Sequence, residues 1–274
     1  MKTILLATDF SPAGNNAVQY GCAMAKKLEA KVVLVHAYSL PLGGYDSMAP
    51  LEVISEMQTA SRDALREYKK ELLTEFGSDF EIEIYAAAGS SEGIISEAAD
   101  KYSAALVVVG IVDHAGTLKK HLTGSTVTDV IHDLTIPVLI VPETCKYHEI
   151  SSVVFAFDPH EEEDTTPYIM VKQFTNLFSA KLELLSVLPM PIDAKLAQKV
   201  KDHVEGLFAD TLHKTTILHA SDVKKGLQDA LNVNTADLIL LHPKKHGFLS
   251  RLFESGTTAR LVYALKTPML SFHV

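Results

Sequence analysis

Residues 4–9 read Ile-Leu-Leu-Ala-Thr-Asp, and residues 153–158 repeat that pattern as Val-Val-Phe-Ala-Phe-Asp. Each segment is a short, nearly continuous apolar run that ends on an aspartate. Such runs are typical of parallel strands with helices on both faces, because neither face of the strand meets water. The recurrence predicts that the chain consists of two related α/β units.

Further matched segments follow in the same order along the chain. Residues 30–35 pair with 180–185, Gly93-Ile94-Ile95 with Gly226-Leu227-Gln228, Gly124-Ser125-Thr126 with Gly256-Thr257-Thr258, and Pro137-Val138-Leu139 with Pro268-Met269-Leu270. So many matches in one order are hard to obtain by chance. The 274 residues are therefore expected to form two tandem domains, at 1–145 and 146–274.

Short apolar runs alternate with helical patterns in both halves. In the first half we predict strands at 4–7, 32–37, 82–88, 105–109 and 138–141, and helices at 15–28, 52–76, 92–102 and 125–133. In the second half we predict strands at 153–157, 181–188, 215–219, 238–241 and 269–272, and helices at 165–178, 193–212, 223–233 and 258–265. Strands that alternate with helices form right-handed β-α-β units. The expected fold class is α/β, with two doubly wound domains, each a five-stranded parallel sheet with helices on both faces.

Composition and charge limit the classes of partner and the cellular location that we expect. The net charge is −9, from 34 acidic and 25 basic residues, which argues against a nucleic acid or an anionic membrane as partner. No apolar stretch approaches the length of a membrane span, and the first apolar run is too short for a signal-peptide core. The two cysteines do not form a Cys-x-x-Cys pair, so no zinc ribbon is expected. We expect a cytoplasmic protein with reduced thiols.

In doubly wound sheets, ligands bind beyond the carboxyl ends of the strands, where the strand order reverses. Asp9 follows the first strand, and its carboxylate could accept hydrogen bonds from a ribose hydroxyl or an adenine amine. The alternative is that Asp9 caps the following helix, since aspartate is a strong N-cap residue.

A second candidate region follows the fourth strand. Gly110 ends that strand, and Gly124-Ser125-Thr126 opens the next predicted helix, whose free amides favour an anion. Lys119 and Lys120 either add positive charge there or form a solvated basic turn. The segment is neither a Walker loop nor the dinucleotide fingerprint. By itself it is a weak signal.

Together these segments resemble the universal stress protein family, over almost the whole chain. The resemblance rests on the opening Ile-Leu-x-x-Thr-Asp-Phe-Ser, on Leu34-Val35-His36, on Gly89 with Gly93-Ile94-Ile95, on Gly110 with Gly124-Ser125, and on residues 137–142. It implies a Rossmann-like fold of the adenine nucleotide alpha hydrolase type. Asp9 would meet the adenosine end of an ATP or AMP ligand, Ala37 would line the base pocket, and Gly110 and Gly124–Thr126 would hold ribose and phosphates. The candidate binding residues are Ala7, Thr8, Asp9, Ala37, Val109, Gly110, Gly116, Gly124, Ser125 and Thr126.

The chain departs from the family's motif Gly-x2-Gly-x9-Gly-[Ser/Thr]. Asp113 stands where the second glycine belongs, and the interval from Gly110 to Gly124 is one residue longer than in the motif. Gly116 could compensate, and AMP would tolerate Asp113 better than ATP. In the second copy, His242 replaces the first glycine, Pro243 removes an amide donor, and residues 161–164 are all acidic. We therefore expect a degenerate second site.

The leading expectation is a stress-response sensor or adaptor that binds an adenine nucleotide in its first domain, with Mg²⁺ if the ligand is ATP. The alternatives are a scaffold that binds no nucleotide and a slow nucleotide hydrolase. No catalytic residue and no metal site is predicted. In the family such domains pair through the fifth strand, so the two copies are expected to form a pseudo-dimer within one chain. Association of two chains is a further expectation from the resemblance.

Overall fold

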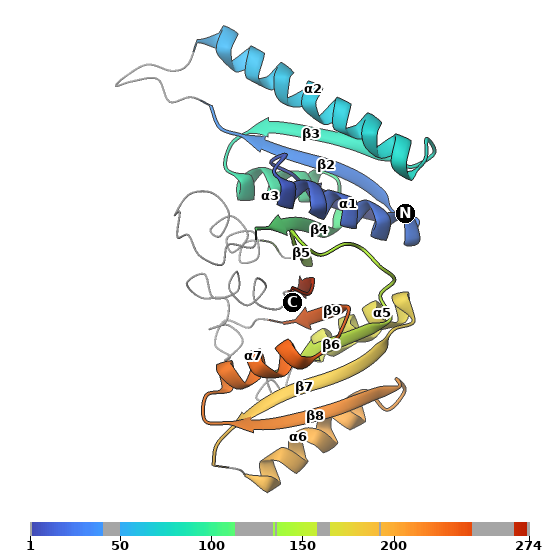
Figure 1. Cartoon of the computed structure of the whole chain (residues 1–274), viewed down its shortest axis with the longest axis vertical. Helices are drawn as coiled ribbons and strands as arrows, with labels where there is room; N and C mark the ends of the chain where they lie inside the picture. The colour runs from blue at the N-terminus through green and yellow to red at the C-terminus, as the bar shows by residue number, and fades with distance from the viewer. Residues whose placement is uncertain are drawn as a thin grey trace, which may run out of the picture. The chain divides into compact units, whose positions relative to one another are not determined.

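The computed structural model describes residues 2–40, 50–112, 134, 136–157, 165–191, 193–242 and 266–272 (Figure 1). The chain divides into two compact units, residues 1–147 and 148–274. The helices expected at 125–133 and 258–265 lie outside the described residues.

The first unit contains a parallel sheet in the order β3-β2-β1-β4-β5. Its strands are β1 (Thr3–Ala7), β2 (Lys31–Tyr38), β3 (Ile82–Ala88), β4 (Ala104–Ile111) and β5 (Val138–Pro142). All five residues of β5 are buried, as are the central residues of β1, β2 and β4. Burial on both faces explains why these strands read as continuous apolar runs.

Three described helices flank this sheet: α1 (Pro12–Lys27), α2 (Leu51–Phe76) and α3 (Ser91–Lys101). Right-handed crossovers place α1 and α2 on one face, because both connections step toward β3. The connection through α3 steps back across the sheet to β4, which places α3 on the other face (Figure 1).

The predicted start of the first helix at Asn15 is wrong. The helix α1 begins at Pro12, because Ser11 caps it by accepting a hydrogen bond from the Gly14 amide, 3.1 Å away. Proline suits the first helical position, where its missing N–H would have had no partner in the helix.

The second unit repeats the arrangement in the strand order β10-β9-β6-β7-β8, again parallel throughout. Its strands are β6 (Ser152–Ala156), β7 (Lys181–Pro189), β8 (His213–Ala220), β9 (Leu238–Leu241) and β10 (Met269–Ser271). The helices are α5 (Thr166–Phe178), α6 (Ala194–Leu207) and α7 (Val223–Val233). The predicted end of α6 at Leu212 is wrong, since Phe208 is its C-cap and the chain then turns into β8.

The predicted fold class is confirmed, with a doubly wound parallel sheet in each unit. In the first unit the strand order reverses between β1 and β4, and their carboxyl ends lie beside the N-terminus of α1. Among the described residues, no helix is long and apolar enough to cross a bilayer.

Candidate functional site

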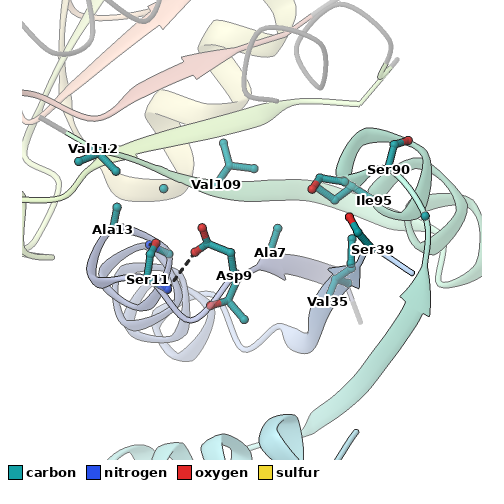
Figure 2. A pocket seen from close by; sticks show the side chains of 16 residues that line it. Ala7, Asp9, Ser11, Ala13, Val35, Ser39, Ser90, Ile95, Val109 and Val112 are labelled. Carbon is teal, nitrogen blue, oxygen red and sulfur yellow. Dashed lines mark hydrogen bonds between the residues drawn. The ribbon is translucent and has the colours of Figure 1, made fainter. Parts of the chain in front are cut away.

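A cavity of about 230 Å³ opens at the carboxyl ends of β1 and β4, where the strand order of the first unit reverses. This is the place at which doubly wound sheets bind their ligands. Figure 2 shows its lining side chains, which come from β1, β2 and β4 and from the N-terminal turns of α1 and α3. The lining residues are Ala7, Thr8, Asp9, Ser11, Ala13, Gly14, Val35, Ala37, Ser39, Gly89, Ser90, Ser91, Ile95, Val109, Gly110 and Val112.

The turn from β1 into α1 presents Asp9 to this cavity. Asp9 Oδ1 accepts a hydrogen bond from the Ser11 amide at 3.0 Å, and the exposed carboxylate points toward the cavity (Figure 2). Because Ser11 caps α1, the alternative prediction that Asp9 is the N-cap is wrong. Among the described residues that line the cavity, Asp9 carries the one charged side chain.

Thr8 shapes the same turn with its hydroxyl group. Thr8 Oγ1 accepts a hydrogen bond from the Phe10 amide at 2.9 Å and lies 3.2 Å from Asn15 Oδ1. The Thr8 amide donates to the Val35 carbonyl at 2.9 Å, which continues the bonding between β1 and β2 by one residue. Thr8 is itself buried, so its hydroxyl is committed to the turn.

Gly14 leaves room for the Asp9 side chain, because a Cβ atom added to Gly14 would lie 2.6 Å from Asp9 Oδ1. Gly110 allows β4 and α1 to come close together, because a Cβ atom added to Gly110 would lie 2.3 Å from the Ala13 carbonyl oxygen. Real Cβ atoms do not approach backbone atoms this closely. The family resemblance implied that Gly110 helps to hold ribose and phosphates; the described contact that requires a glycine at this position is with the backbone of α1.

The floor of the cavity is apolar and made of small side chains. Ala7 and Ala37 are half-buried, whereas Val35 and Val109 beside them are buried. Alternation along β2 places Val35, Ala37 and Ser39 on one face of the strand.

The N-terminus of α3 also borders the cavity. Ser90 caps this helix by accepting a hydrogen bond from the Gly93 amide at 3.3 Å, and Ser91 is its first residue. Ser90, Ser91 and Ile95 line the cavity but were absent from the sequence-based candidates. The serine three residues before Gly93 is an N-cap signal that would have placed the start of α3 here, but not shown which of its residues line the cavity.

The structure brings together the six described residues of the predicted site. Ala7, Thr8, Asp9, Ala37, Val109 and Gly110 all line the cavity. The other four candidates, Gly116, Gly124, Ser125 and Thr126, lie outside the described residues, as do Asp113, Lys119 and Lys120. Their contribution stays a prediction.

The corresponding edge of the second unit has larger and buried side chains. Backbone bonding identifies the equivalents, because the Phe157 amide donates to the Leu185 carbonyl just as the Thr8 amide donates to Val35. Strand register then matches His242 to Gly110. Phe157 and His242 are 1 % and 3 % exposed, and both belong to an aromatic cluster with Phe155 and Phe272.

The surroundings of Cys22, Cys145 and Tyr68 favour structural roles for these side chains over chemical ones. Burial, with a smaller contribution from Glu75, raises the pKa of Cys22 to about 12. Burial raises the pKa of Cys145 as well, so both thiols are protonated and weakly nucleophilic at neutral pH. Burial also raises the pKa of Tyr68, whose hydroxyl donates to the Asn15 carbonyl at 3.3 Å. Within the described part of the chain, no group of three or more His, Cys, Asp and Glu side chains is placed to hold a metal ion.

The chain is similar to known proteins in sequence and in fold. The sequence model of the universal stress protein family matches residues 1–142. A universal stress protein from Archaeoglobus fulgidus DSM 4304 superimposes with a TM-score of 0.73 at 18 % identity, over 99 % of this chain and 96 % of the other. For a putative universal stress protein from Pseudomonas aeruginosa UCBPP-PA14 the TM-score is 0.60 at 13 % identity, over 100 % and 93 % of the two chains. At these identities the structural likeness concerns the fold. No curated protein matches the sequence.

Proposed function

The chain belongs to the universal stress protein family, and on that premise we propose that its first unit binds an adenine nucleotide, ATP or AMP. The observation that carries the proposal is the cavity at the switch point of the sheet, which gathers all six described candidate residues. The base would lie on the floor formed by Ala7 and Ala37. Asp9 would accept hydrogen bonds from a ribose hydroxyl or an adenine amine.

The helix termini at the cavity supply a place for phosphate. The first turns of α1 and α3 both border it, through Ala13, Gly14 and Ser91. Helix N-termini carry free amides and the positive end of the helix dipole, so they attract an anion without a basic side chain. With ATP, Mg²⁺ would accompany the phosphates, and the loop that follows β4 would contribute Gly116 and Gly124–Thr126.

The ligand experiment has two stages. Protein purified without added nucleotide is analysed by mass spectrometry for a bound adenine nucleotide, and calorimetry then measures the affinities for AMP and ATP. The Asp9→Asn variant keeps an Oδ1 acceptor for the Ser11 amide but loses the charge. Since a hydrogen bond to a charged group contributes about 1.5–3 kcal/mol, we expect at least about tenfold weaker binding.

The matched control is Asp79→Asn, which changes an exposed aspartate that does not line the cavity. This variant should bind AMP and ATP like the wild type. Absence of bound nucleotide, together with no heat signal at millimolar AMP or ATP, would refute nucleotide binding. That outcome would favour the second candidate function, a scaffold without a nucleotide.

At the level of the cell, we propose a cytoplasmic sensor or adaptor in the stress response. The support for this cellular role comes from the family. The cavity supports only the binding of a nucleotide, to which such a sensor would respond. Released phosphate or pyrophosphate that disappears in Asp9→Asn would instead support the slow hydrolase. No general base is predicted for that reaction.

We further propose that the two units pair within one chain through their terminal strands. In the order of its own unit, β5 stands at one end, and so does β10. Terminal strands have unpaired backbone groups that favour pairing with another strand. Hydrogen exchange tests this, because the β5 amides that do not bond to β4 should exchange slowly in the wild type. Rapid exchange of those amides would contradict the pairing.

A further inference from the structure

The turn that presents Asp9 contains a residue with an unusual backbone. Phe10 has φ of +62°, in the left-handed region that non-glycine residues seldom occupy. Phe10 lies between Asp9 and Ser11, so the direction of the Asp9 carboxylate depends on this conformation. Such a conformation persists only where surrounding contacts hold it.

The Phe10 ring is held on two sides by aromatic groups. Its centroid lies 4.7 Å from that of the His36 imidazole and 6.3 Å from that of the Tyr68 ring. The backbone is held as well, since Asn15 Nδ2 donates a hydrogen bond to the Phe10 carbonyl at 3.2 Å.

His36 also binds the backbone of the turn. His36 Nδ1 lies 2.9 Å from the Thr8 carbonyl oxygen. Because a carbonyl oxygen only accepts, the proton of this contact must sit on Nδ1, which fixes the tautomer of the neutral ring. His36 lies on β2 between Val35 and Ala37, which line the cavity, yet it does not line the cavity itself.

We propose that His36 is a positioning residue of the nucleotide site. It orients Asp9 by donating to the Thr8 carbonyl and by packing against Phe10, without touching the ligand. The inference rests on the proposed nucleotide-binding function. Comparison between the units supports it, because the residue of β7 that matches His36 in register is Ser186, and the turn residue that matches Thr8 is Phe157.

The test uses three variants that differ in where they place an N–H donor. His36→Asn puts its amide nitrogen as many bonds from the backbone as Nδ1, His36→Gln puts it one bond further, and His36→Leu has no donor. A typical hydrogen bond contributes about 0.5–1.5 kcal/mol, so loss of the donor should weaken AMP and ATP binding about 2- to 13-fold. We expect this loss for Leu and Gln, and a smaller loss for Asn, which keeps the donor but lacks the ring that packs against Phe10.

The control is His213→Leu, which removes a bond of the same kind in the second unit, where His213 Nδ1 lies 2.7 Å from the Thr211 carbonyl oxygen. It should lower the unfolding midpoint and leave nucleotide affinity unchanged. Wild-type affinity in His36→Leu would overturn the proposal, and so would an Asn variant as weak as the Leu variant.

A readout without ligand separates this inference from the proposed function. If the wild type bound neither AMP nor ATP, the proposed function would fail, and imidazole nitrogen NMR with amide hydrogen exchange would still test the turn. A proton on Nδ1 of His36, with faster exchange at Phe10 and Ser11 in the Leu variant than in the Asn variant, supports the positioning role. A proton on Nε2, or equal exchange in both variants, overturns it.

Discussion

The carboxyl edges of the two sheets have the same strand register and different side chains. In the first unit Thr8, Ala37 and Gly110 surround an open cavity, and in the second unit Phe157, Val187 and His242 occupy the matching positions and are buried. At each of the three positions the side chain of the second unit is larger than that of the first. The helix beside this edge also packs differently. A Cβ atom added to Gly226 of α7 would lie 2.6 Å from Ala220 Cβ and 3.1 Å from Val187 Cγ1, whereas one added to the matching Gly93 of α3 meets, among the described residues, only Ser90 Oγ of its own cap within 4 Å. The comparison teaches that the fold supplies the place for a site, and that side-chain size decides how much room the described residues leave there.

The largest expected effect on stability comes from replacing Phe157 of the second unit with threonine, the residue at the matching position of the first unit. Phe157→Thr removes most of a fully buried ring from the aromatic cluster with Phe155. Large-to-small changes of this kind cost about 3–5 kcal/mol of the free energy of unfolding. Hydrogen exchange of peptides from 152–157 should report the loss. Phe174→Thr, on the half-exposed side of α5, should cost much less, and equal costs would mean that the cluster does not stabilise this edge.

The second prediction concerns the stability cost of replacing Gly110 in the first unit. Gly110→Ala places a Cβ against the Ala13 carbonyl, so α1 and β4 must move apart. Overpacking costs about 1–3 kcal/mol of the free energy of unfolding. Chemical denaturation of the variant measures it. The control is Gly206→Ala, where an added Cβ has no neighbour within 4 Å and better helix propensity predicts a small gain. A neutral Gly110→Ala would show that the close approach is not required.

The third prediction concerns a substitution that makes the floor of the cavity resemble the matching surface of the second unit. Ala37→Val introduces the residue that stands at the matching position of β7, Val187. The added methyl groups narrow the space for a base, so we expect about tenfold weaker AMP binding, equivalent to about 1.4 kcal/mol. Calorimetry measures the affinity. Ala105→Val, at an exposed position near the start of β4, is the control and should bind normally.

The smallest effect concerns the opposite, amino edge of the second sheet. Asp237 Oδ2 accepts hydrogen bonds from the amides and hydroxyls of Ser151 and Ser152, all at 2.8–2.9 Å. Burial raises the pKa of Asp237, but these hydrogen bonds outweigh it and the net shift is downward. A carboxyl whose pKa is lowered by folding stabilises the fold above its unfolded pKa, and that stabilisation is lost as the pH falls through the folded value. The first unit has Ala105 at the matching position.

The variant Asp237→Asn should therefore reduce stability at pH 7 and flatten its decline below about pH 4, near the unfolded pKa of aspartate. Urea unfolding at a series of pH values measures this. The control is Asp229→Asn at an exposed position of α7, which should leave the profile unchanged. An unchanged profile in Asp237→Asn would show that this aspartate does not contribute to the acid sensitivity.

Sequence patterns predicted the bounds of several elements correctly. The predicted strand at 82–88 and helix at 223–233 match β3 and α7 residue for residue. The largest errors fall at helix ends, namely the start of α1 at Pro12 and the end of α6 at Leu207, because a cap or a turn sets these ends and apolar periodicity does not. Strand ends were missed by one or two residues, as at β4 and β8. Ser90 and Ile95 were missed for a related reason, because their place at the cavity depends on where α3 returns to the sheet.

The sequence by itself determined the fold class, the repeat and the family, because apolar periodicity and short motifs are properties of neighbouring residues. It also pointed to Asp9, Ala37 and Gly110, which lie far apart in the chain and line one cavity. Only the tertiary structure decided what each does locally. Gly110 is needed for the backbone of α1, Ser11 rather than Asp9 caps that helix, and His36 holds the Thr8 carbonyl from the neighbouring strand. These roles depend on distances between elements, which follow from packing and cannot be derived from a local pattern.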